Sequence, residues 1–382
     1  MRQTLLRIRL DDIWSMAPID GITGVGLGYV VLVIWSLMAA NWAMATFRRD
    51  GLTRDDLPGV LIWFGSAAAL LAIGQWLIPA RFTSIPVYGY GFMLFLGFFS
   101  AAWLAMRRAK SVGLSGDLIW DLAVWIIVSG IGGARLLYVI RFPENVFVDE
   151  VGLAIVGWSK FFAIFNLPKG GLVLYGGVIL GLLVFFWFCR RRKLNPLLMA
   201  DVIVPSFFVG LAFGRLGCFL NGCCYGDVCN LPWAVQFPAD SATFHALSIK
   251  GYLSDTATAT MSLHPTQLYS SINAVVLAIL TATYFKHRHQ NGAVLALALC
   301  TYPVTRFVIE YLRSDELTVV MTIRTALLWG DEVTTFSTPF TPSQWVSLVL
   351  FSIGLIFAGY LQRRARGAVL VTPPSGAAPA AA

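Results

Sequence analysis

Charged residues are scarce in this chain of 382 residues, since Lys, Arg, Asp and Glu together make up only 13% of it and 57% of the residues are hydrophobic. A soluble domain needs more charge than this to cover its surface, so that class of protein is excluded. Apolar stretches of about 20 residues, long enough to cross a bilayer as helices, recur along the sequence. Barrel strands, which alternate over about ten residues, are disfavoured by the same runs. The composition therefore predicts an all-α, polytopic helical membrane protein.

Further absences narrow the function. The first twenty residues lack a small-residue cleavage site after a short apolar core, so no removable signal peptide is predicted. Basic residues form only short clusters at the ends of apolar runs, so the net charge of +8 does not indicate a nucleic-acid partner. We find no internal repeat. The spacing of the cysteines is not that of a zinc site.

Nine stretches are long and apolar enough to be membrane spans. They are Gly21 to Phe47, Leu57 to Ala80, Ile85 to Met106, Leu118 to Ile140, Leu172 to Cys189, Leu197 to Phe213, Thr266 to Phe285, Gly292 to Leu312 and Pro342 to Leu361.

Basic clusters mark alternate ends of these spans. They are Arg48-Arg49 with Arg54, Arg107-Arg108 with Lys110, Arg190 to Lys193, Lys286 with Arg288, and Arg363-Arg364 with Arg366. Because Lys and Arg are enriched in cytoplasmic loops, we expect these ends inside, the amino terminus outside and the carboxyl terminus in the cytoplasm. The long connections Arg141 to Gly171, Gly214 to Pro265 and Arg313 to Thr341 then face outward.

Composition divides the chain into three parts. Residues 1–81 hold the first two spans, with no cluster of catalytic side-chain types, and are predicted to be an added transmembrane hairpin. Residues 82–366 carry the other spans and the polar residues discussed below. Residues 367–382 are rich in Ala and Pro and are predicted to be a disordered cytoplasmic tail.

Polar groups inside spans are expensive unless they have partners, so they are the default functional candidates. Arg135 lies roughly 8 Å from the outer end of its span at about 1.5 Å per residue, and Arg306 lies at a similar depth. The predicted topology places the following set in one outer layer: Tyr88, Tyr90, Arg135, Tyr175, Arg215, Asn221, His264, Gln267, Tyr269, Arg306 and Glu310. Asp121 and Asp201 lie near cytoplasmic ends and are interpreted as structural.

Several of these residues also have a simpler interpretation. Arg306 and Glu310 are four residues apart on one helix face and could pair with each other. Arg135 could extend its side chain to the interface, although the adjacent glycines Gly130, Gly132 and Gly133 favour close helix packing. Tyr88 and Tyr90 could belong to the aromatic belt of the membrane interface.

The stretch from Gly214 to Gly226 combines an arginine with four cysteines nearby in the sequence: Cys218, Cys223, Cys224 and Cys229. Arg215 lies among glycines where an apolar span is predicted to end, which suggests a site for an anionic group such as a lipid phosphate. The cysteines could supply a nucleophile, form disulfides in an oxidising exterior, or pack as small side chains.

The same stretch resembles the signature of the prolipoprotein diacylglyceryl transferase family, with Gly214-Arg215-Leu216-Gly217, Asn221-Gly222 and Gly226 at matching spacing. Further matches follow in order: Tyr90-Gly91, Gly132-Gly133-Ala134-Arg135, Gly176-Gly177, His264-Pro265-Thr266-Gln267-Leu268-Tyr269, Arg306-Phe307 with Glu310, and Thr341-Pro342-Ser343-Gln344. The resemblance covers Pro86 to Arg366 and implies a seven-helix core, to which the first hairpin is an addition.

The resemblance implies an enzyme of the bacterial inner membrane that moves a diacylglyceryl group from phosphatidylglycerol to the lipobox cysteine of a prolipoprotein. The products would be a thioether and glycerol phosphate. Its partners would be phosphatidylglycerol, the prolipoprotein signal peptide and membrane lipids, and its active site would lie toward the outer leaflet. No cofactor is implied.

Residue roles follow from the matched positions. The residues expected to be catalytic are Arg215, Arg306, Tyr175, His264 and Glu310, and those expected to bind substrate are Tyr90, Arg135, Gly176, Gly177, Asn221, Gly226 and Gln267. Three positions depart from the family pattern: Cys218 replaces an asparagine, Cys223 an acidic residue and Tyr175 a histidine. The general base is therefore open among Tyr175, His264 and Glu310.

Two rival functions are compatible with the sequence. The chain could be a diverged or inactive paralogue that acts on another acceptor, which the three departures would support. It could also be a membrane anion transporter gated by outer arginines, although transporters usually show repeats and sites near the bilayer midplane.

Overall fold

The computed structural model describes residues 4–9, 14–18, 22–34, 36–38, 84–147, 164, 171, 173–239, 241–254, 256–313, 320–324, 333–337 and 340–371. The chain forms two compact units, which we describe one at a time. Unit 1 comprises Met1–Phe95 and Gly214–Gln267, and unit 2 comprises Leu96–Phe213 and Leu268–Ala382. Three long helices begin in one unit and continue into the other along the chain.

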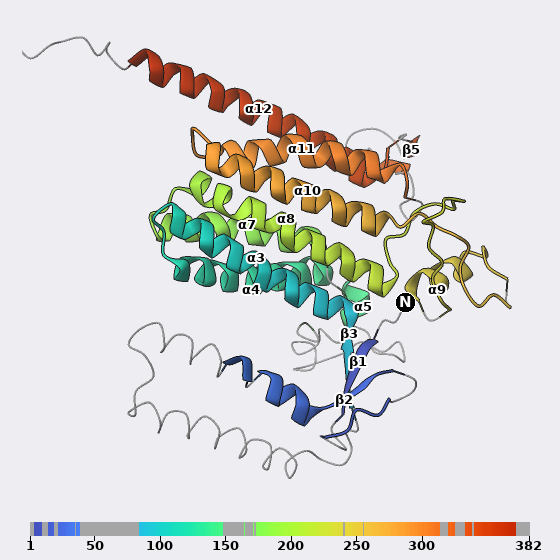
Figure 1. Cartoon of the computed structure of the whole chain (residues 1–382). Helices are drawn as coiled ribbons and strands as arrows, with labels where there is room; N and C mark the ends of the chain where they lie inside the picture. Colours follow the sequence, from blue (N-terminus) through green and yellow to red (C-terminus); the bar gives the residue numbers. More distant parts are fainter. Residues whose placement is uncertain are drawn as a thin grey trace, which may run out of the picture. The chain divides into compact units, whose positions relative to one another are not determined.

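Seven long helices correspond to the third to ninth predicted spans (Figure 1). They are α3 (Gly89–Ser111), α4 (Gly116–Arg141), α7 (Leu174–Arg191), α8 (Pro196–Asn221), α10 (Thr266–His287), α11 (Ala293–Glu310) and α12 (Pro342–Val371). Six of them, all but α7, are long and apolar enough in their described residues to cross a membrane. The prediction of a polytopic helical membrane protein is confirmed.

The count of nine spans stays a prediction. Residues 27–34 and 36–38, inside the first predicted span, are helical. The second predicted span, Leu57 to Ala80, lies outside the described residues. The division of the chain at residue 81 likewise stays a prediction.

Two predicted span boundaries were wrong. The third span begins at Gly89 rather than Ile85, because Ser84–Tyr88 form strand β3. The sixth span continues to Asn221 rather than ending at Phe213, so the signature begins inside helix α8. Helix α12 also continues to Val371, so residues 367–371 of the predicted tail are helical, and residues 372–382 lie outside the described part.

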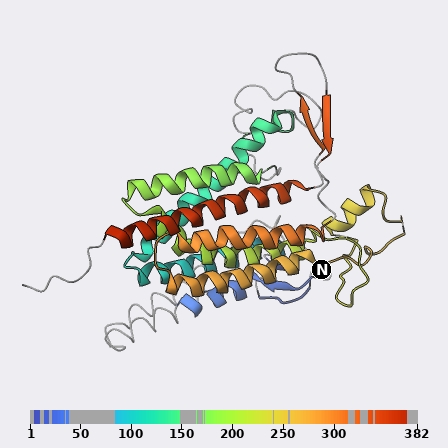
Figure 2. The same cartoon turned by 90° about the horizontal axis from the view of Figure 1, so that it is seen from above.

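Unit 2 is built from apolar helices that run side by side (Figures 1 and 2). The pairs α4 with α7 and α11 with α12 pack against each other. Small and aliphatic residues fill the core, among them Ala109, Leu122, Met199 and Val202, all of which are at most 2% exposed. Arg108, in the last turn of α3, donates from Nη1 to the Ser206 hydroxyl over 2.7 Å. The arginine at this helix end thus links α3 to α8.

Asp201 fixes the start of helix α11 in the same unit. Its carboxylate is fully buried and accepts from the backbone N–H groups of Gly292 (2.8 Å) and Leu295 (3.0 Å), and it lies 3.7 Å from Nε of Arg288. Gly292 is the N-cap residue of α11 and Leu295 lies in its first turn, so these amides have no partners within the helix. Asp121 similarly pairs with Arg192 over 2.8 Å. Both aspartates have the structural contacts expected of them.

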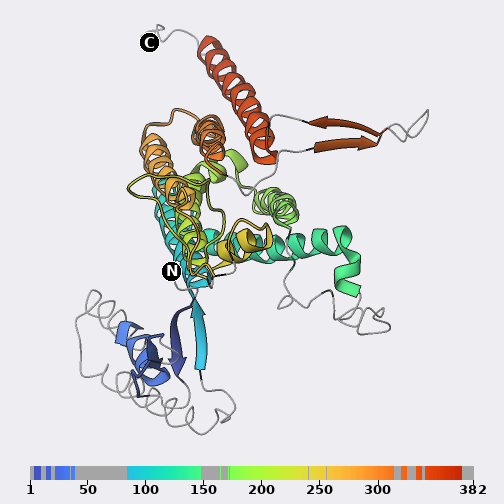
Figure 3. The same cartoon turned by 90° about the vertical axis from the view of Figure 1, so that its right-hand side faces the viewer.

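The connection between α11 and α12 contains two strands, β4 (Val320–Arg324) and β5 (Val333–Ser337), which pair antiparallel (Figure 3). Thr341 and Gln344 then start α12 with a capping box. The Thr341 N–H donates to Oε1 of Gln344 over 3.0 Å, and the Gln344 N–H donates to the Thr341 hydroxyl over 3.3 Å. The Thr-Pro-Ser-Gln sequence is therefore a helix start.

Unit 1 contains a small sheet that the sequence analysis did not predict. Strand β1 (Thr4–Arg9) lies between β2 (Gly24–Gly26), which is parallel to it, and β3 (Ser84–Tyr88), which is antiparallel. The connection after α8 carries helix α9 (Ala242–Ile249) and an apolar cluster of Tyr225, Phe237, Leu247 and Leu263. The amino-terminal strand is thereby joined to the strand that leads directly into α3.

Candidate functional site

The first half of the signature forms the last two turns of helix α8. Gly214, Arg215, Gly217 and Cys218 are helical, and glycine at 217 lets α3 approach closely. A Cβ atom on Gly217 would lie 3.1 Å from Cδ2 of Tyr90 and 3.4 Å from its carbonyl oxygen. The glycines therefore bring the start of α3, with Tyr90, against the arginine-bearing turn of α8.

Helix α8 ends in a Schellman motif at the centre of the signature. The N–H of Cys223 donates to the carbonyl of Cys218 (3.1 Å), and the N–H of Gly222 donates to that of Phe219 (3.2 Å). Gly222 takes the left-handed conformation that this motif requires, with φ of +71°. The Asn-Gly pair of the signature is therefore the point at which the chain leaves the helix.

The loop after this point is held by the residues that start helix α10. Nε2 of Gln267 donates to the carbonyl of Cys223, and the hydroxyl of Thr266 donates to that of Cys224, both over 2.8 Å. The N–H of Gly226 donates to the carbonyl of His264 over 3.1 Å. The signature and the residues that start α10 are thus joined, although about 40 residues separate them in the sequence. The outer position of His264 and Gln267 stays a prediction.

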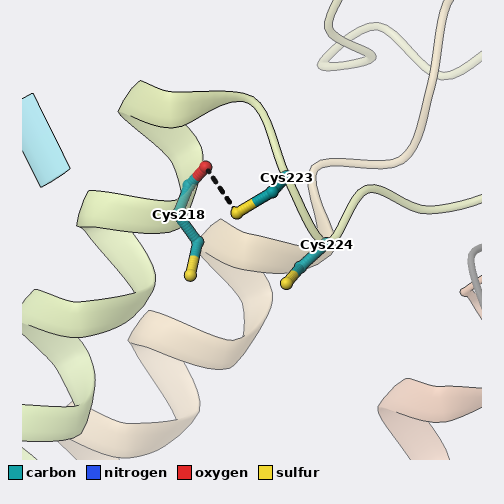
Figure 4. A group of neighbouring side chains, drawn as sticks. All are labelled: Cys218, Cys223 and Cys224. Carbon is teal, nitrogen blue, oxygen red and sulfur yellow. Dashed lines mark hydrogen bonds between the residues drawn. The ribbon is translucent and has the colours of Figure 1, made fainter. Parts of the chain in front are cut away.

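Three of the four clustered cysteines come together at the end of α8 (Figure 4). The Sγ atoms of Cys218, Cys223 and Cys224 all lie within 4.8 Å of one another. The Cys223 thiol donates to the carbonyl oxygen of Cys218 over 3.7 Å. None of the three forms a disulfide in the structure. The sequence spacing did not predict this group, because a helix end and a sharp turn create it.

The turn at Cys224 is what aims adjacent cysteines the same way. Cys224 has φ of +61°, a left-handed conformation that costs a residue with a Cβ about 1–2 kcal/mol. The hydrogen bond with Cys218 lowers the pKa of the Cys223 thiol, but the hydrogen bond with Cys224 and burial outweigh it, so that pKa is raised. The metal-free thiol of Cys223 is therefore protonated at neutral pH.

Tyr90 and Arg215 lie within electrostatic reach of this group in unit 1. Tyr90 interacts electrostatically with Arg215 and with all three thiols, and Asn221 hydrogen-bonds to the Cys223 side chain. Arg215 is partly buried. The structure therefore groups Tyr90, Arg215, Asn221 and the cysteines around one end of α8.

The second group of predicted residues is an ion-pair cluster in unit 2. Nη1 of Arg306 lies 2.6 Å from Oε2 of Glu310, and Nη1 of Arg313 lies 3.7 Å from the same oxygen. Glu310 also accepts from the Thr341 hydroxyl (3.4 Å), and Arg306 donates to the Ser343 hydroxyl (3.3 Å). The interpretation that Arg306 and Glu310 pair with each other is confirmed.

This cluster contains more positive than negative charge among its described members, namely two guanidinium groups and one carboxylate. Arg313 was missed in the sequence analysis, although its spacing of three residues from Glu310 was a usable signal. Glu310 is therefore engaged by two guanidinium groups and one hydroxyl group, which fixes the position of its side chain.

Arg135 is buried within the protein, at 7% exposure. Its Nε donates to the carbonyl of Ile164 (2.8 Å) and its Nη1 to that of Gly171 (3.1 Å). These carbonyls belong to the connection that precedes α7. The structure gives Arg135 a role in holding that connection, and its role toward a lipid headgroup stays a prediction.

Gly176 and Gly177 lie where α7 packs on α4. A Cβ on Gly176 would collide with the backbone of Gly133, and one on Gly177 would lie 2.7 Å from the carbonyl oxygen of Gly130. Gly132 faces open space instead. The predicted close packing is confirmed at Gly133, whereas a Cβ on Gly130 would also meet nothing within 4 Å. Headgroup contact by Gly176 and Gly177 stays a prediction.

Tyr175 has less support from its surroundings. It is 57% exposed, and no side-chain hydrogen bond to its hydroxyl is found among the residues that the structure describes. Its role as a base stays a prediction.

Comparison with known proteins gives consistent matches. A family model described as prolipoprotein diacylglyceryl transferase matches residues 78–360. A phosphatidylglycerol–prolipoprotein diacylglyceryl transferase of Clostridium tetani is 34% identical over 231 residues, covering 60% of this chain and 82% of the relative. One of Gloeobacter violaceus is 34% identical over 241 residues, covering 63% and 81%. The matched region begins just before strand β3.

Proposed function

Because the chain belongs to the prolipoprotein diacylglyceryl transferase family, we propose that it transfers a diacylglyceryl group from phosphatidylglycerol to the lipobox cysteine of prolipoproteins. The observation that carries this proposal is the signature at the end of α8. It combines a partly buried arginine, close-packed glycines and a loop fixed by His264, Thr266 and Gln267.

The reaction sets the chemical requirement. The acceptor sulfur forms a bond to the glycerol carbon, the bond from that carbon to the phosphoester oxygen breaks, and the electron pair leaves with glycerol phosphate. Negative charge on the phosphate therefore grows in the transition state. A cation held in a water-poor site, placed before the reaction begins, stabilises such charge most effectively.

Arg215 is assigned this role in unit 1. It lies on a helix turn whose partner, Tyr90, is positioned by contact with Gly217, so neither group needs to reorganise when the lipid binds. Tyr90 and Asn221 are assigned to headgroup hydrogen bonds, and Gly226 to the shape of the loop. These assignments rest on the family signature and on the packing of α3 against α8.

Arg306 remains a proposed phosphate-binding cation of unit 2. Its ion pair with Glu310 fixes the guanidinium group, and an arginine in an ion pair can still bind a phosphate because a guanidinium has five N–H donors. Glu310 is then a positioning residue rather than a base. Of the three candidates for the base, His264 keeps the best support, because its backbone is bonded to Gly226 and Asp227 of the signature loop.

The substrates also indicate the location. We propose that the protein lies in the bacterial inner membrane with its amino terminus outside, its carboxyl terminus in the cytoplasm and its site toward the outer leaflet. The basic clusters at the ends of α3, α7 and α10 support this orientation. A signal peptide anchored in the same membrane would present its cysteine at this depth.

The decisive experiment is incubation of the purified full-length protein with phosphatidylglycerol vesicles and a lipobox peptide, followed by mass spectrometry of the peptide. We expect the mass of a diacylglyceryl group on the cysteine. Arg215→Ala should lower the rate by about 100-fold or more, the usual effect of removing one charge-stabilising donor. Arg215→Lys should retain more activity, because it keeps the charge.

Arg364→Ala is the matched control, since Arg364 is exposed near the end of α12 and outside both residue groups. A folded wild-type protein that leaves the peptide unmodified would contradict the proposal and favour a diverged paralogue. Anion flux into liposomes without lipid turnover would favour the transporter.

A further inference from the structure

The three-thiol group of Cys218, Cys223 and Cys224 is not used by the mechanism above. A covalent role is unsuitable for these cysteines, because a diacylglyceryl group on a cysteine is a thioether, which is a poor leaving group for a second transfer. Packing alone does not explain why adjacent cysteines both face Cys218 through a left-handed turn (Figure 4). The arrangement is instead typical of ligands for one soft metal ion.

The distances fit a metal ion with little movement. In a tetrahedral zinc site with Zn–S bonds of about 2.3 Å, the sulfur atoms are about 3.8 Å apart. The three Sγ atoms here already lie within 4.8 Å of one another. Small side-chain rotations would therefore bring them to ligating distance, and only three protein ligands are present in the group. A zinc site with three protein ligands leaves one position open.

The backbone around the thiols is fixed in advance. The carbonyls of Cys223 and Cys224 accept from Gln267 and Thr266, and the N–H of Cys223 belongs to the Schellman motif. Such outer contacts orient metal ligands in known sites. The loop thus holds its sulfur atoms without needing the metal to fold it.

A second observation points to a missing ligand. Gln267 is 1% exposed, and its Oε1 atom has no hydrogen-bond partner among the described residues, although Nε2 of the same amide donates to Cys223. A buried acceptor without a donor is costly. A water or a peptide N–H bound beside Cys223 would supply such a donor.

We propose that Cys218, Cys223 and Cys224 bind one zinc ion, whose fourth position receives the thiol of the acceptor cysteine. The second half of this inference rests on the proposed function, because it assumes a thiol acceptor. Zinc binding displaces the protons of three thiols, and the incoming acceptor thiol releases its own proton to water. A metal-bound thiol is deprotonated, so no side chain of the protein needs to act as base.

The transfer step then balances without an oxidant or reductant. The zinc-bound thiolate sulfur supplies the electron pair for the new bond to the glycerol carbon. The bond from that carbon to the phosphate oxygen breaks, and its electron pair leaves with glycerol phosphate. The product thioether carries no negative charge and is a weaker ligand, so it leaves the metal and reopens the fourth position.

Metal binding is tested first, without any lipid. The reduced full-length protein in detergent is equilibrated with zinc, separated from free metal and analysed for bound zinc by mass spectrometry. We expect one zinc per chain, and affinity at least about tenfold lower in Cys218→Ser, Cys223→Ser and Cys224→Ser. Cys229→Ser and Cys300→Ser are matched controls that should bind as the wild type does, because neither belongs to the group.

Cobalt is the probe for the open position. Co(II) in place of zinc should give a thiolate-to-metal absorption band that grows when a lipobox peptide is added, and a peptide with serine for cysteine should leave it unchanged. No band growth would overturn the acceptor role of the metal. Wild-type protein that binds no zinc while its thiols are reduced, or whose thiols form a disulfide as purified, would overturn the site itself.

The two proposals fail separately. Lipid transfer by metal-free wild-type protein, with activity unaffected by a strong chelator, would overturn the metal inference and leave the proposed function intact. Zinc binding that needs all three cysteines, in a protein that never modifies the peptide, would support the site and contradict the proposed function. Reversible reloading of the wild type with zinc provides a readout if the serine variants fail to fold.

Discussion

At the scale of single residues, the most consequential feature is the buried carboxylate of Glu310, at 2% exposure. It lies against two arginines, Arg306 and Arg313, and accepts from a threonine hydroxyl. Buried charges of opposite sign stabilise each other, because removal of one leaves the other buried without a partner and raises the free energy of the folded protein. The pairing therefore serves stability, whether or not Arg306 also contacts a phosphate.

Glu310→Ala should destabilise the protein by about 3–5 kcal/mol, the usual cost of breaking a buried ion pair from one side. The double variant Arg306→Ala with Glu310→Ala should lose less than the sum of the single variants, because neither Arg306 nor Glu310 is then left without the other, although Arg313 still loses the carboxylate. Thermal unfolding in detergent measures both. Additive losses would show that the pair is not coupled.

Glu310→Gln distinguishes the effect of Glu310 on stability from its effect on lipid transfer. It keeps the shape and the hydrogen bond from Thr341 but removes the charge that holds Arg306. We expect lipid transfer to fall more than thermal stability does. Transfer unchanged in this variant would exclude both the positioning role and a role for Glu310 as base.

At the scale of elements, glycine decides how α4 meets α7. Membrane helices associate through close backbone contact, since apolar burial gives little driving force inside a bilayer. A Cβ on Gly133 would collide with the backbone of Gly176, whereas one on Gly132 would meet nothing within 4 Å. Neighbouring glycines in the same motif therefore have different roles.

Gly133→Ala should separate α4 from α7, lower the unfolding temperature and reduce transfer. Gly132→Ala is its matched control, and it should be neutral or slightly stabilising because Ala is a better helix former than Gly by about 1 kcal/mol. Thermal unfolding of both variants in detergent checks this. Equal effects at the two positions would contradict the packing described here.

The end of α8 gives a second test at this scale. In Gly222→Ala the new Cβ would lie 3.1 Å from Cβ of Ser241, at a backbone φ of +71° that disfavours alanine. The substitution should therefore strain the Schellman motif. Gly113→Ala has a similar φ of +78° and open space around it, so it should show only the conformational cost. We expect Gly222→Ala to lose more stability and most of its zinc binding. Similar losses in the two variants would show that crowding at Gly222 is unimportant.

At the scale of the whole molecule, the chain is a multi-pass membrane protein of the diacylglyceryl transferase family. Its orientation is a proposal based on basic clusters at the carboxyl-terminal ends of α3, α7 and α10. Reporter fusions to the full-length protein test it. Alkaline phosphatase should be active when it is fused at the amino terminus and inactive when it is fused at the carboxyl terminus. A fluorescent protein fused at the carboxyl terminus should fluoresce.

The sequence predicted the helices well because hydropathy over about 20 residues is a strong local signal. Spans three to nine were predicted near their observed bounds, and the sequence motifs singled out Arg215, Asn221, His264 and Gln267. The prediction erred at Ile85 and Phe213, because strand pairing of β3 and the apolar glycine-rich turn of α8 do not alter hydropathy. The strands near the amino terminus were missed for the same reason.

The sequence alone thus determined the membrane class, the order of the main helices and the family signature, since these depend on local composition and spacing. Only the tertiary structure decided that Glu310 is shared by two arginines, that Gly133 rather than Gly132 forms the α4–α7 contact, and that three cysteines converge. Each of these depends on side chains brought together from different turns or helices. The spacing of residues in the sequence does not predict the left-handed turn at Cys224 or the helix end that precedes it.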